Sequence, residues 1–442
     1  HVFMADSAVY IGEAPPAESY LNMEKMINAA IQTKSDAIHP GWGFLAENDK
    51  FAKMVMDAGL IWIGPPPEVI RAVGDKIEAK RLAKKANVPT IPGIIDVVDI
   101  GQIKQWMNDE KISYPIMIKA VSGGGGKGMV KVETDEQLSQ AFAQARSEAM
   151  KAFGDERVLV EKYIERGRHI EVQVVADKYR NVVHLFEREC TIQRRNQKII
   201  EEAPSPTLNH DLRREICFTA TRLMREIGYS STGTVEFLFD SSTKKFYFLE
   251  VNTRLQVEHG ITELITGLDI VGIMIDVAMD KKLPFKQPDI HPNRWALEVR
   301  LNAEDPKNFS PSFGTITRLQ VPQGPAVRVA SGVYEGADIP PYYDSLFMLL
   351  MTSGADREDA IRVMDRALSR NLRVEGVKTL APLLLSIIRH PAFIAGEFST
   401  RFIEEHIDEL VSMFKDKNSE DEVLKIARYV AEISALGPQK WM

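Results

Sequence analysis

The sequence predicts a protein of mixed α/β and α+β class, with two or three domains and a small inserted module. Three observations support this prediction. The 442 residues exceed what one ordinary hydrophobic core organises. Short apolar runs alternate with amphipathic helices from Val9 to Gly64, a pattern typical of βα units. Farther along, two predicted strands within Ile116–Val132 enclose a glycine-rich loop, and Ala296–Leu350 is rich in strand-forming residues.

The composition excludes several classes of protein. A hydrophobic content of 44% and a charged content of 26%, without low-complexity tracts, are typical of a globular protein. The net charge of −7 argues against bulk nucleic-acid binding. No apolar run approaches the roughly 18 residues of a membrane span, and no secretory signal opens the sequence. The two cysteines, Cys190 and Cys217, fit a reducing compartment, so we expect a cytoplasmic protein, or one of an organelle matrix if the source is eukaryotic.

Turn and capping signals place the predicted elements along the chain. In order, they are strands at 36–39 and 60–63, a helix at 75–87, a Pro/Gly-rich linker at 88–93, strands at 116–121 and 129–132, a helix at 134–153, strands in "VLVEKYI" and "HIEVQVVAD", and a helix at 209–228. Thr134 begins the helix of the inserted module, and Gln137 is expected to complete its capping box. Helices follow the strand-rich later part.

The glycine run "GGGGKG" at 123–128 joins two of these strands. It satisfies G-x-G-x-x-G but lacks the helix that a dinucleotide-binding turn requires next, and Gly128 stands where a Walker P-loop has Ser or Thr. Five glycines in six residues carry a high entropic cost for an ordinary hairpin tip, so we predict that the loop covers phosphate groups. Lys119, on the entering strand, is expected to reach phosphate oxygens.

A second hairpin is predicted in "TGTVEFLFDSSTKKFYFLEVN". If Asp240 pairs with Phe246, Glu236 lies directly opposite Glu250, with the Cβ atoms roughly 5 Å apart. Two carboxylates at about 5 Å repel by about 3 kcal/mol at an effective dielectric of 20. A divalent cation between them removes this repulsion, and oxygen ligands suit Mg²⁺ or Mn²⁺. The sequence therefore predicts a metal site, which Asn252 extends.

Polar residues alternate with apolar ones beyond this pair, at Glu250, Asn252, Arg254, Gln256 and Glu258. Period two predicts a strand with one packed face and one free face. The assumed register also aligns Val235 with Val251 and Leu238 with Phe248. Because opposed carboxylates lie at its start, we interpret the free face as a site rather than as a solvated surface.

Together these motifs resemble the ATP-grasp superfamily, and specifically the biotin carboxylases, from His1 to about Glu405. The segments that carry the resemblance are "AIHPGWGFLAEN", "GDK", "IKAVSGGGGKGM", "VEKYIERGRHIEVQV", "ERECTIQRRNQKIIEEAPSP", "GTVEFLF", "FLEVNTRLQVEHGITE", "ALEVRLNAEDP" and "PPYYDSL". The resemblance implies that the family's first βαβ segment would precede His1. It also implies that 1–64 is the remainder of the N-terminal domain, 65–90 a linker helix, 91–163 the ATP-grasp lid, 164–405 the ATP-grasp core with the C-terminal domain, and 406–442 a helical extension.

Carried over position by position, the resemblance implies an ATP site. Phosphates would be bound by Lys76, Lys119 and the loop backbone at Gly125 and Gly126. The adenine hinge would be Glu161, Lys162, Tyr163 and Ile164, and the pocket would be lined by His169, Gln193, Asn196 and Leu238. Two Mg²⁺ or Mn²⁺ ions would be held by Glu236, Glu250 and Asn252.

The resemblance likewise implies a site for bicarbonate and biotin. Bicarbonate would be held by Lys198, Arg254, Gln256 and Val257. Glu258 would remove the bicarbonate proton, and Arg300 would face the ureido oxygen of biotin. The implied reaction is ATP-dependent carboxylation of biotin through carboxyphosphate.

Three residues depart from the family pattern. Trp42, beside the expected biotin pocket, stands where Tyr is frequent, Asn196 where His is usual, and Gly260 where Pro is common. Two alternatives stay open: another bicarbonate-using ATP-grasp ligase of the carbamoyl-phosphate synthetase type, and a non-catalytic nucleotide-binding subunit. The motifs "EVRLNAEDP" and "PPYYDSL" favour the biotin branch.

The resemblance also implies partners. Biotin in this class is attached to a lysine flanked by methionines on a hairpin turn, whereas Lys151 in "EAMKAF" falls inside a predicted helix. We therefore expect the biotinylated carrier and the carboxyltransferase on other chains, and a homodimer of this one. The final acceptor, an acyl-CoA such as acetyl-CoA or else pyruvate, stays open. The predicted helix that begins at Ser419 is expected either to pack on its own domain or to dock a partner subunit.

Overall fold

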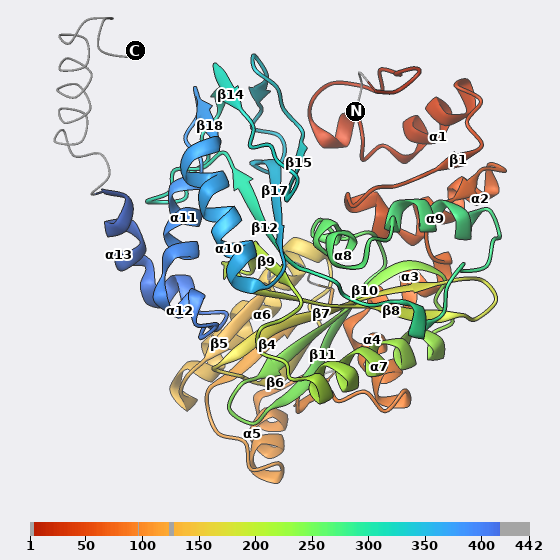
Figure 1. Cartoon of the computed structure of the whole chain (residues 1–442). Helices are drawn as coiled ribbons and strands as arrows, with labels where there is room; N and C mark the ends of the chain where they lie inside the picture. The colour runs from red at the N-terminus through yellow and green to blue at the C-terminus, as the bar shows by residue number, and fades with distance from the viewer. Residues whose placement is uncertain (1–3, 96, 123–127, 416–442) are drawn as a thin grey trace, which may run out of the picture.

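The computed structural model describes residues 4–95, 97–122 and 128–415 (Figure 1). The predicted phosphate contacts at Gly125 and Gly126, and the predicted helix beginning at Ser419, lie outside the described residues. Within the described part of the chain, no helix is long and apolar enough to cross a membrane.

The N-terminal unit has the predicted βα pattern. Two short strands, β1 (Ala37–Ile38) and β2 (Ile61–Trp62), pair in parallel and flank α2 (Asp49–Asp57), and α1 (Met23–Gln32) precedes them. Apolar side chains on the inner faces, among them Phe51 and Trp62, form a small core of their own. Two further helices, α3 (Pro67–Gly74) and α4 (Lys76–Lys85), lead toward the inserted module.

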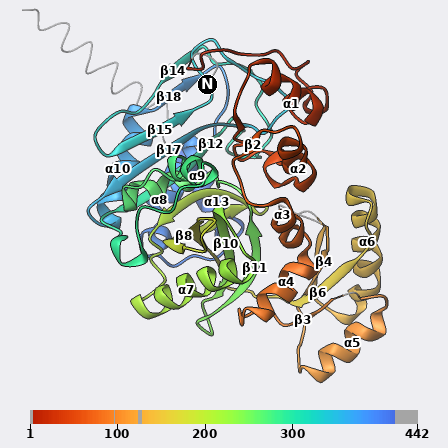
Figure 2. The same cartoon turned by 90° about the vertical axis from the view of Figure 1, so that its right-hand side faces the viewer.

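The inserted module is a four-stranded sheet in the order β3 (Gly93–Ile94), β6 (Val158–Lys162), β4 (Ile116–Ala120), β5 (Met129–Val132). It is packed by α5 (Ile100–Asp109) and α6 (Asp135–Phe153) around a separate core. Figure 2 shows this module standing out from the rest of the molecule, as a lid would. Helix α5 was not predicted from the sequence.

The predicted capping box of α6 is wrong in its details. Thr134 is the N-cap residue, but its side chain makes no capping hydrogen bond. The Gln137 side chain instead accepts the backbone N–H of Glu133 at 3.0 Å, one residue before the cap. Lys151 lies within this helix and is exposed, as expected of an ordinary surface lysine.

The largest sheet has eight antiparallel strands and runs through the centre of the molecule (Figure 1). Its order is β11 (Lys245–Asn252), β10 (Ser231–Asp240), β7 (Gly167–Ala176), β8 (Val182–Arg194), β9 (Gln197–Ala203), β12 (Trp295–Asn302), β17 (Leu346–Gly354), β15 (Val327–Ser331). Helix α7 (His210–Glu226) packs on one face, against β7 and β8. Helix α8 (His259–Thr266) contacts β12 and its neighbours, and α9 (Ile270–Ala278) contacts β10.

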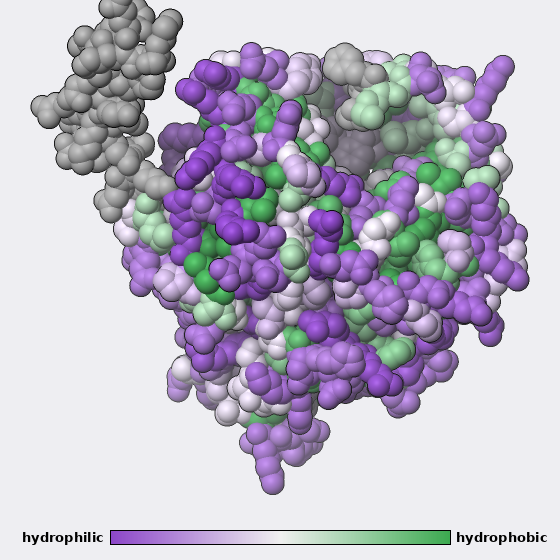
Figure 3. Space-filling view, in the orientation of Figure 1, coloured by the Kyte–Doolittle hydropathy of each residue, from purple (hydrophilic) through white to green (hydrophobic). Residues whose placement is uncertain are grey.

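Alternation along β7 decides which face carries polar groups. Ile170, Val172 and Val174 belong to the core that α7 covers, so His169, Glu171 and Gln173 point to the opposite face. The last part of the chain completes the C-terminal domain with α10 (Arg357–Arg366), α11 (Ala381–Arg389), α12 (Pro391–Ile394) and α13 (Phe402–Lys415). Figure 3 shows a hollow between the N-terminal segment and the C-terminal strands.

The predicted register of the β10–β11 hairpin is right at the carboxylates and wrong at the turn. Glu236 is paired with Glu250, and Val235 with Val251. Asp240, however, pairs with Lys245 rather than Phe246, and Phe248 pairs with Phe237 rather than Leu238. A bulge at Leu249 makes up the difference of one residue.

This bulge has a packing reason. Phe246, Phe248 and Val251 all belong to the core under α7. In a regular strand they could not share one face, because the first two numbers are even and the third is odd. One extra residue between them lets all three face the core, and it leaves Glu250 on the opposite, polar face.

Candidate active site

Polar side chains from several strands of the central sheet meet on the face that α7 does not cover. Lys198 of β9 is the centre of this group, because its Nζ atom lies 2.5 Å from Glu171, 2.8 Å from Glu236 and 2.7 Å from Glu258. Burial opposes the charged form of this lysine. The three carboxylates nevertheless hold the pKa of Lys198 well above its usual value.

Glu258 is fully buried and is held between two cations. One oxygen accepts from Lys198, and the other accepts from Nη2 of Arg300 at 2.9 Å. Against the effect of burial, Lys198 and Arg300 hold the pKa of Glu258 well below the usual range. Arg300 is oriented in turn by Glu201, which accepts its Nε–H at 2.6 Å. The carboxylate is therefore ionised and fixed in direction.

The polar alternation predicts a strand that continues as far as Glu258, and this prediction is wrong. Strand β11 ends at Asn252, and Arg254 and Gln256 lie in a loop that leads into α8. The loop still brings them to the site, because Arg254 donates to Gln256 at 2.9 Å and Gln256 donates to Glu236 at 3.3 Å. Hydrogen bonding within the site, rather than a sheet ladder, fixes this segment.

The predicted metal residues lie together and fit a hard divalent cation. Cross-strand pairing brings Glu236 and Glu250 side by side. Burial and the charge of Glu236 raise the pKa of Glu250, as expected of a carboxylate without a close counter-ion among the described residues. Asn252 adds an amide oxygen, which also accepts from Arg254 at 3.3 Å. Two carboxylates and an amide oxygen are a suitable donor set for Mg²⁺ or Mn²⁺.

The predicted phosphate lysines approach one another from two different modules. Lys76, at the start of α4, lies 3.5 Å from the carbonyl oxygen of Ala120, directly after Lys119. Burial and the charge of Lys76 lower the pKa of Lys119 to about 8. These cations are therefore crowded, and an anionic ligand between them would be stabilising.

The predicted nucleotide pocket residues fall into two groups. His169 and Leu238 are direct cross-strand partners, and Gln193 lies 2.9 Å from His169. His169 also lies 3.0 Å from Glu236, and this carboxylate raises its pKa although burial acts in the opposite sense. The hinge residues form the other group at the end of the lid strand β6. Glu161 and Lys162 are its last two residues, and Tyr163 and Ile164 follow it.

Three predicted residues have a more local structural setting. Asn196 is exposed in the two-residue turn between β8 and β9 at a φ of 66°, a conformation that asparagine tolerates. Trp42 is 44% exposed, and its ring lies 6.2 Å from that of His259, one residue beyond Glu258. Val257 packs beside the core that holds α8 against β12.

Sequence reasoning missed several residues of the site. Glu171 is fully buried between Lys198 and Arg188, whose Nε lies 2.5 Å away. Arg188 also donates to Gln173 at 2.7 Å. The signal was present in "HIEVQ", where His169, Glu171 and Gln173 alternate with apolar residues on a predicted strand. Glu201 gave no such signal.

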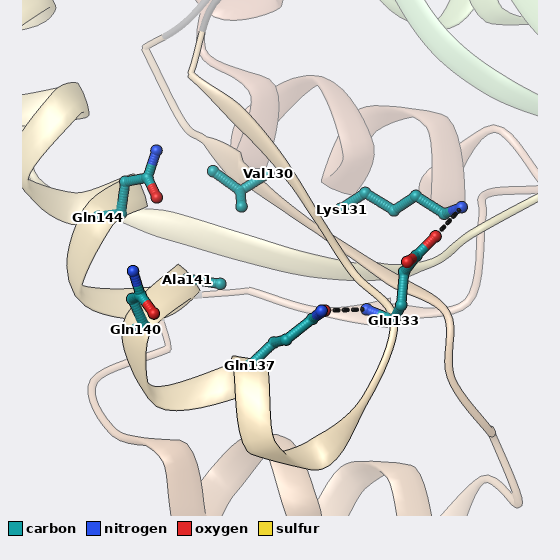
Figure 4. A pocket seen from close by; sticks show the side chains of 7 residues that line it. All are labelled: Val130, Lys131, Glu133, Gln137, Gln140, Ala141 and Gln144. Atoms are coloured by element: carbon teal, nitrogen blue, oxygen red, sulfur yellow. Dashed lines mark hydrogen bonds and ion pairs between the residues drawn. The ribbon is translucent and has the colours of Figure 1, made fainter.

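A groove on the lid lies away from these residues. It measures about 410 Å³ and lies between β5 and α6 (Figure 4). The described residues that line it are Val130, Lys131, Glu133, Gln137, Gln140, Ala141 and Gln144, none of which is a predicted site residue.

Comparison with protein families gives three matches, which together cover most of the chain. Residues 1–70 match "Biotin carboxylase, N-terminal domain", residues 75–286 match "Carbamoyl-phosphate synthase L chain, ATP binding domain", and residues 298–405 match "Biotin carboxylase C-terminal domain". The last match covers the part that separates the two branches considered above.

Curated relatives are similar over most of the chain. Biotin carboxylase 1 of Bacillus subtilis is 44% identical over 407 residues, which are 92% of this chain and 90% of the relative. The mitochondrial propionyl-CoA carboxylase alpha chain of Homo sapiens is 48% identical over 97% of this chain. This chain spans only 59% of that human protein.

Solved structures agree with the fold. The biotin carboxylase domain dimer of Hydrogenobacter thermophilus 2-oxoglutarate carboxylase, in complex with MgADP, ADP and bicarbonate, has a TM-score of 0.88 and 44% identity, covering 92% of this chain and 90% of that one. Campylobacter jejuni biotin carboxylase in a β,γ-ATP complex has a TM-score of 0.89 and 42% identity, with the same coverage of 92% and 90%.

Proposed function

Because the chain belongs to the biotin carboxylase family, we propose that it carboxylates biotin on a carrier protein, using bicarbonate and ATP. The products would be N1-carboxybiotin, ADP and phosphate. The observation that carries the proposal is the position of Glu258 between Lys198 and Arg300, since one base flanked by two cations suits the capture and deprotonation of a small anion.

In the first step, bicarbonate would enter beside Glu258 and take over the contacts of Lys198, with Arg254, Gln256 and Val257 completing its site. Glu258 is a weak base while both cations hold its pKa low. Once bicarbonate shares these cations, the carboxylate becomes more basic and can accept the bicarbonate proton. The deprotonated oxygen then attacks the γ-phosphorus of ATP, the bond to the β-phosphate oxygen breaks, and carboxyphosphate and ADP result.

ATP would lie between the lid and the central sheet. Lys76, Lys119 and the backbone at Gly125 and Gly126 would contact its phosphates, and the hinge at 161–164 its adenine, with His169, Gln193, Asn196 and Leu238 lining the pocket. Glu236, Glu250 and Asn252 would hold the divalent cations, which neutralise charge on the triphosphate when bound. The lid at 91–163 would exclude water from carboxyphosphate, which hydrolyses readily.

In the second step, carboxyphosphate would break into CO₂ and phosphate beside biotin, near Trp42. The phosphate takes the proton from the ureido N1, and Arg300 stabilises the negative charge that develops on the ureido oxygen. The N1 nitrogen then forms its bond to CO₂. Glu201 acts through Arg300, because it fixes the direction of the guanidinium group.

We further propose that the carboxylated biotin belongs to a carrier on another chain or domain and that a carboxyltransferase consumes it. Relatives named as alpha chains of propionyl-CoA carboxylase and the biotin carboxylase subunit of pyruvate carboxylase support this class of assembly. The dimer formed by the similar domain of Hydrogenobacter thermophilus supports a homodimer.

The test is ATP hydrolysis by the purified chain, measured with and without bicarbonate and biotin. A biotin carboxylase requires bicarbonate for hydrolysis and is stimulated by biotin, with label from bicarbonate appearing in carboxybiotin. A ligase of the carbamoyl-phosphate synthetase type would hydrolyse ATP with bicarbonate and ignore biotin. A non-catalytic subunit would bind ATP without turnover.

A further inference from the structure

A buried carboxylate of the lid lies between two lysines. Glu161, on β6, is only 2% exposed. Lys80 of α4 donates a hydrogen bond to its Oε1 atom. Lys119 of β4 approaches the other oxygen, with Nζ and Oε2 2.6 Å apart. One buried anion therefore has two cationic partners, one from outside the lid and one from inside it.

The two partners are not equivalent. The Lys80 contact has hydrogen-bond geometry, whereas the Oε2 atom beside Lys119 has no aligned hydrogen bond among the described residues. Lys119 also lies on the strand that enters the glycine loop, and it is a predicted phosphate ligand. Its contact with Glu161 is thus the one that can be given up.

A phosphate ligand would draw Lys119 away from Glu161. Without another counter-ion, Glu161 would then be a buried and unpaired charge, which is strongly unfavourable. Lys80 would prevent this if it kept its own contact with the carboxylate while Lys119 moved.

Helix α4 carries both a predicted phosphate ligand, Lys76, and the partner of Glu161, Lys80. Lys76 and Lys80 are four residues apart and therefore project from the same helix face, one turn from each other. The first lies beside Ala120, next to the loop, and the second lies beside Glu161. Lys84, one turn farther on, is exposed.

We propose that Lys80 is the fixed counter-ion of Glu161 and that Lys119 exchanges between Glu161 and the phosphates of ATP. Lys80 is then a positioning residue that determines how readily Lys119 becomes available to the nucleotide. This inference rests on the proposed use of ATP and adds a residue to which that proposal gives no role.

The first experiment compares Lys80→Met with the matched control Lys84→Met in the full chain. KM for ATP and kcat are measured by bicarbonate-dependent ATP hydrolysis, and ATP affinity is measured by calorimetry. Lys80→Met should raise KM for ATP by about tenfold with kcat changed less than about threefold, because Lys119 is then the one counter-ion left to this buried carboxylate among the described residues. Lys84→Met should leave both values unchanged, and Lys80→Arg should stay close to the wild type.

The second experiment adds Glu161→Gln to Lys80→Met. A neutral residue at 161 needs no counter-ion, so the double variant should bind ATP better than Lys80→Met alone. An unchanged KM in Lys80→Met would overturn the inference. So would a double variant as impaired as Lys80→Met, because Lys80 would then act on the nucleotide directly. If the wild-type chain itself neither binds nor hydrolyses ATP, the proposed function fails first.

Discussion

At the scale of single residues, the site depends on opposite charges that compensate one another in a buried space. Glu171, Glu236 and Glu258 share Lys198, whereas Glu250 lacks a described cationic partner of this kind at contact distance. All of these residues except Glu171 were predicted from the sequence, because each falls in a motif. The sharing of Lys198 could not, because it depends on strands β7, β9 and β10 and a loop meeting in space.

Glu250→Gln tests the metal residues. We expect the Mg²⁺ or Mn²⁺ concentration for half-maximal ATP turnover to rise, by about tenfold or more, because one anionic ligand is lost. Activity at saturating metal should fall as well. The measurement is a metal titration of initial rates, with Glu148→Gln on the surface of α6 as control. Unchanged metal dependence would remove Glu250 from the metal site.

Glu258 and Arg300 should separate the two halves of the reaction. Glu258→Gln removes the base, so bicarbonate-dependent ATP hydrolysis and biotin carboxylation should both fall, by roughly 100-fold or more. Arg300→Ala should reduce carboxylation more than ATP hydrolysis, because its proposed role is on the ureido oxygen. Parallel assays of phosphate release and of carboxybiotin measure both. An Arg300→Ala variant that carboxylates biotin well would contradict this role.

The lowered pKa of Lys119 predicts a pH dependence. A lysine loses its charge as the pH rises through its pKa, here about 8, and the charged form is the one that attracts phosphate. We therefore expect kcat/KM for ATP, which reports the free enzyme, to decrease above about pH 8. Lys119→Arg, which stays charged, should show a lower but flatter profile between about pH 7 and pH 9.5. A wild-type profile without this decrease would count against the assignment.

At the scale of elements, the β10–β11 hairpin shows where sequence reasoning reaches its limit. The opposed glutamates were predicted through an assumed turn pairing that is wrong, and a bulge at Leu249 restores the pairing. The parity change among Phe246, Phe248 and Val251 would have signalled this bulge. The end of β11 at Asn252 could not be seen, because polar alternation continues through a loop whose hydrogen bonds are made to other strands.

Deletion of Leu249 tests this account of the hairpin. Leu249 is the extra residue that interrupts the in-and-out alternation of β11. Without it the alternation is regular, so the apolar residues should stay on the core side and Glu250 on the site side. Unfolding by urea should show a loss of no more than about 1–2 kcal/mol, with metal-dependent ATPase activity retained. Deletion of Tyr247 is the control, since it turns one phenylalanine out of the core and should cost about 3 kcal/mol or more. Equal losses in both variants would contradict the account.

At the scale of the whole molecule, the lid, the N-terminal unit and the C-terminal domain each have a core of their own. Turn and capping signals located α4 and the long helices α6 and α7, because these signals are local in the sequence. They did not predict the order of the central sheet, in which β10 pairs with β7 and β9 with β12. Such pairings join residues far apart in the sequence, and no local pattern encodes them.

Carrier dependence is the prediction at this scale. We expect free biotin to be carboxylated poorly, because tethering provides an effective concentration in the millimolar range. A biotinylated carrier domain should lower the KM for biotin by about 10-fold or more, whereas the same carrier without biotin should have no effect. The measurement is labelled bicarbonate transfer, with mass spectrometry of the purified chain. Covalent biotin on Lys151 or another described lysine would contradict a separate carrier.

The pairing of β9 with β12 has a consequence for any attempt to divide the protein. The matched family regions end at 286 and begin again at 298, and this suggests a natural place to cut. The sheet, however, continues across that boundary, since Glu201 and Glu298 are paired neighbours. A piece ending near residue 286 would expose the open edge of β9, and its complement would expose β12. Such bare edges recruit other strands, so each piece alone should self-associate, and the two expressed together should find each other and rebuild the sheet.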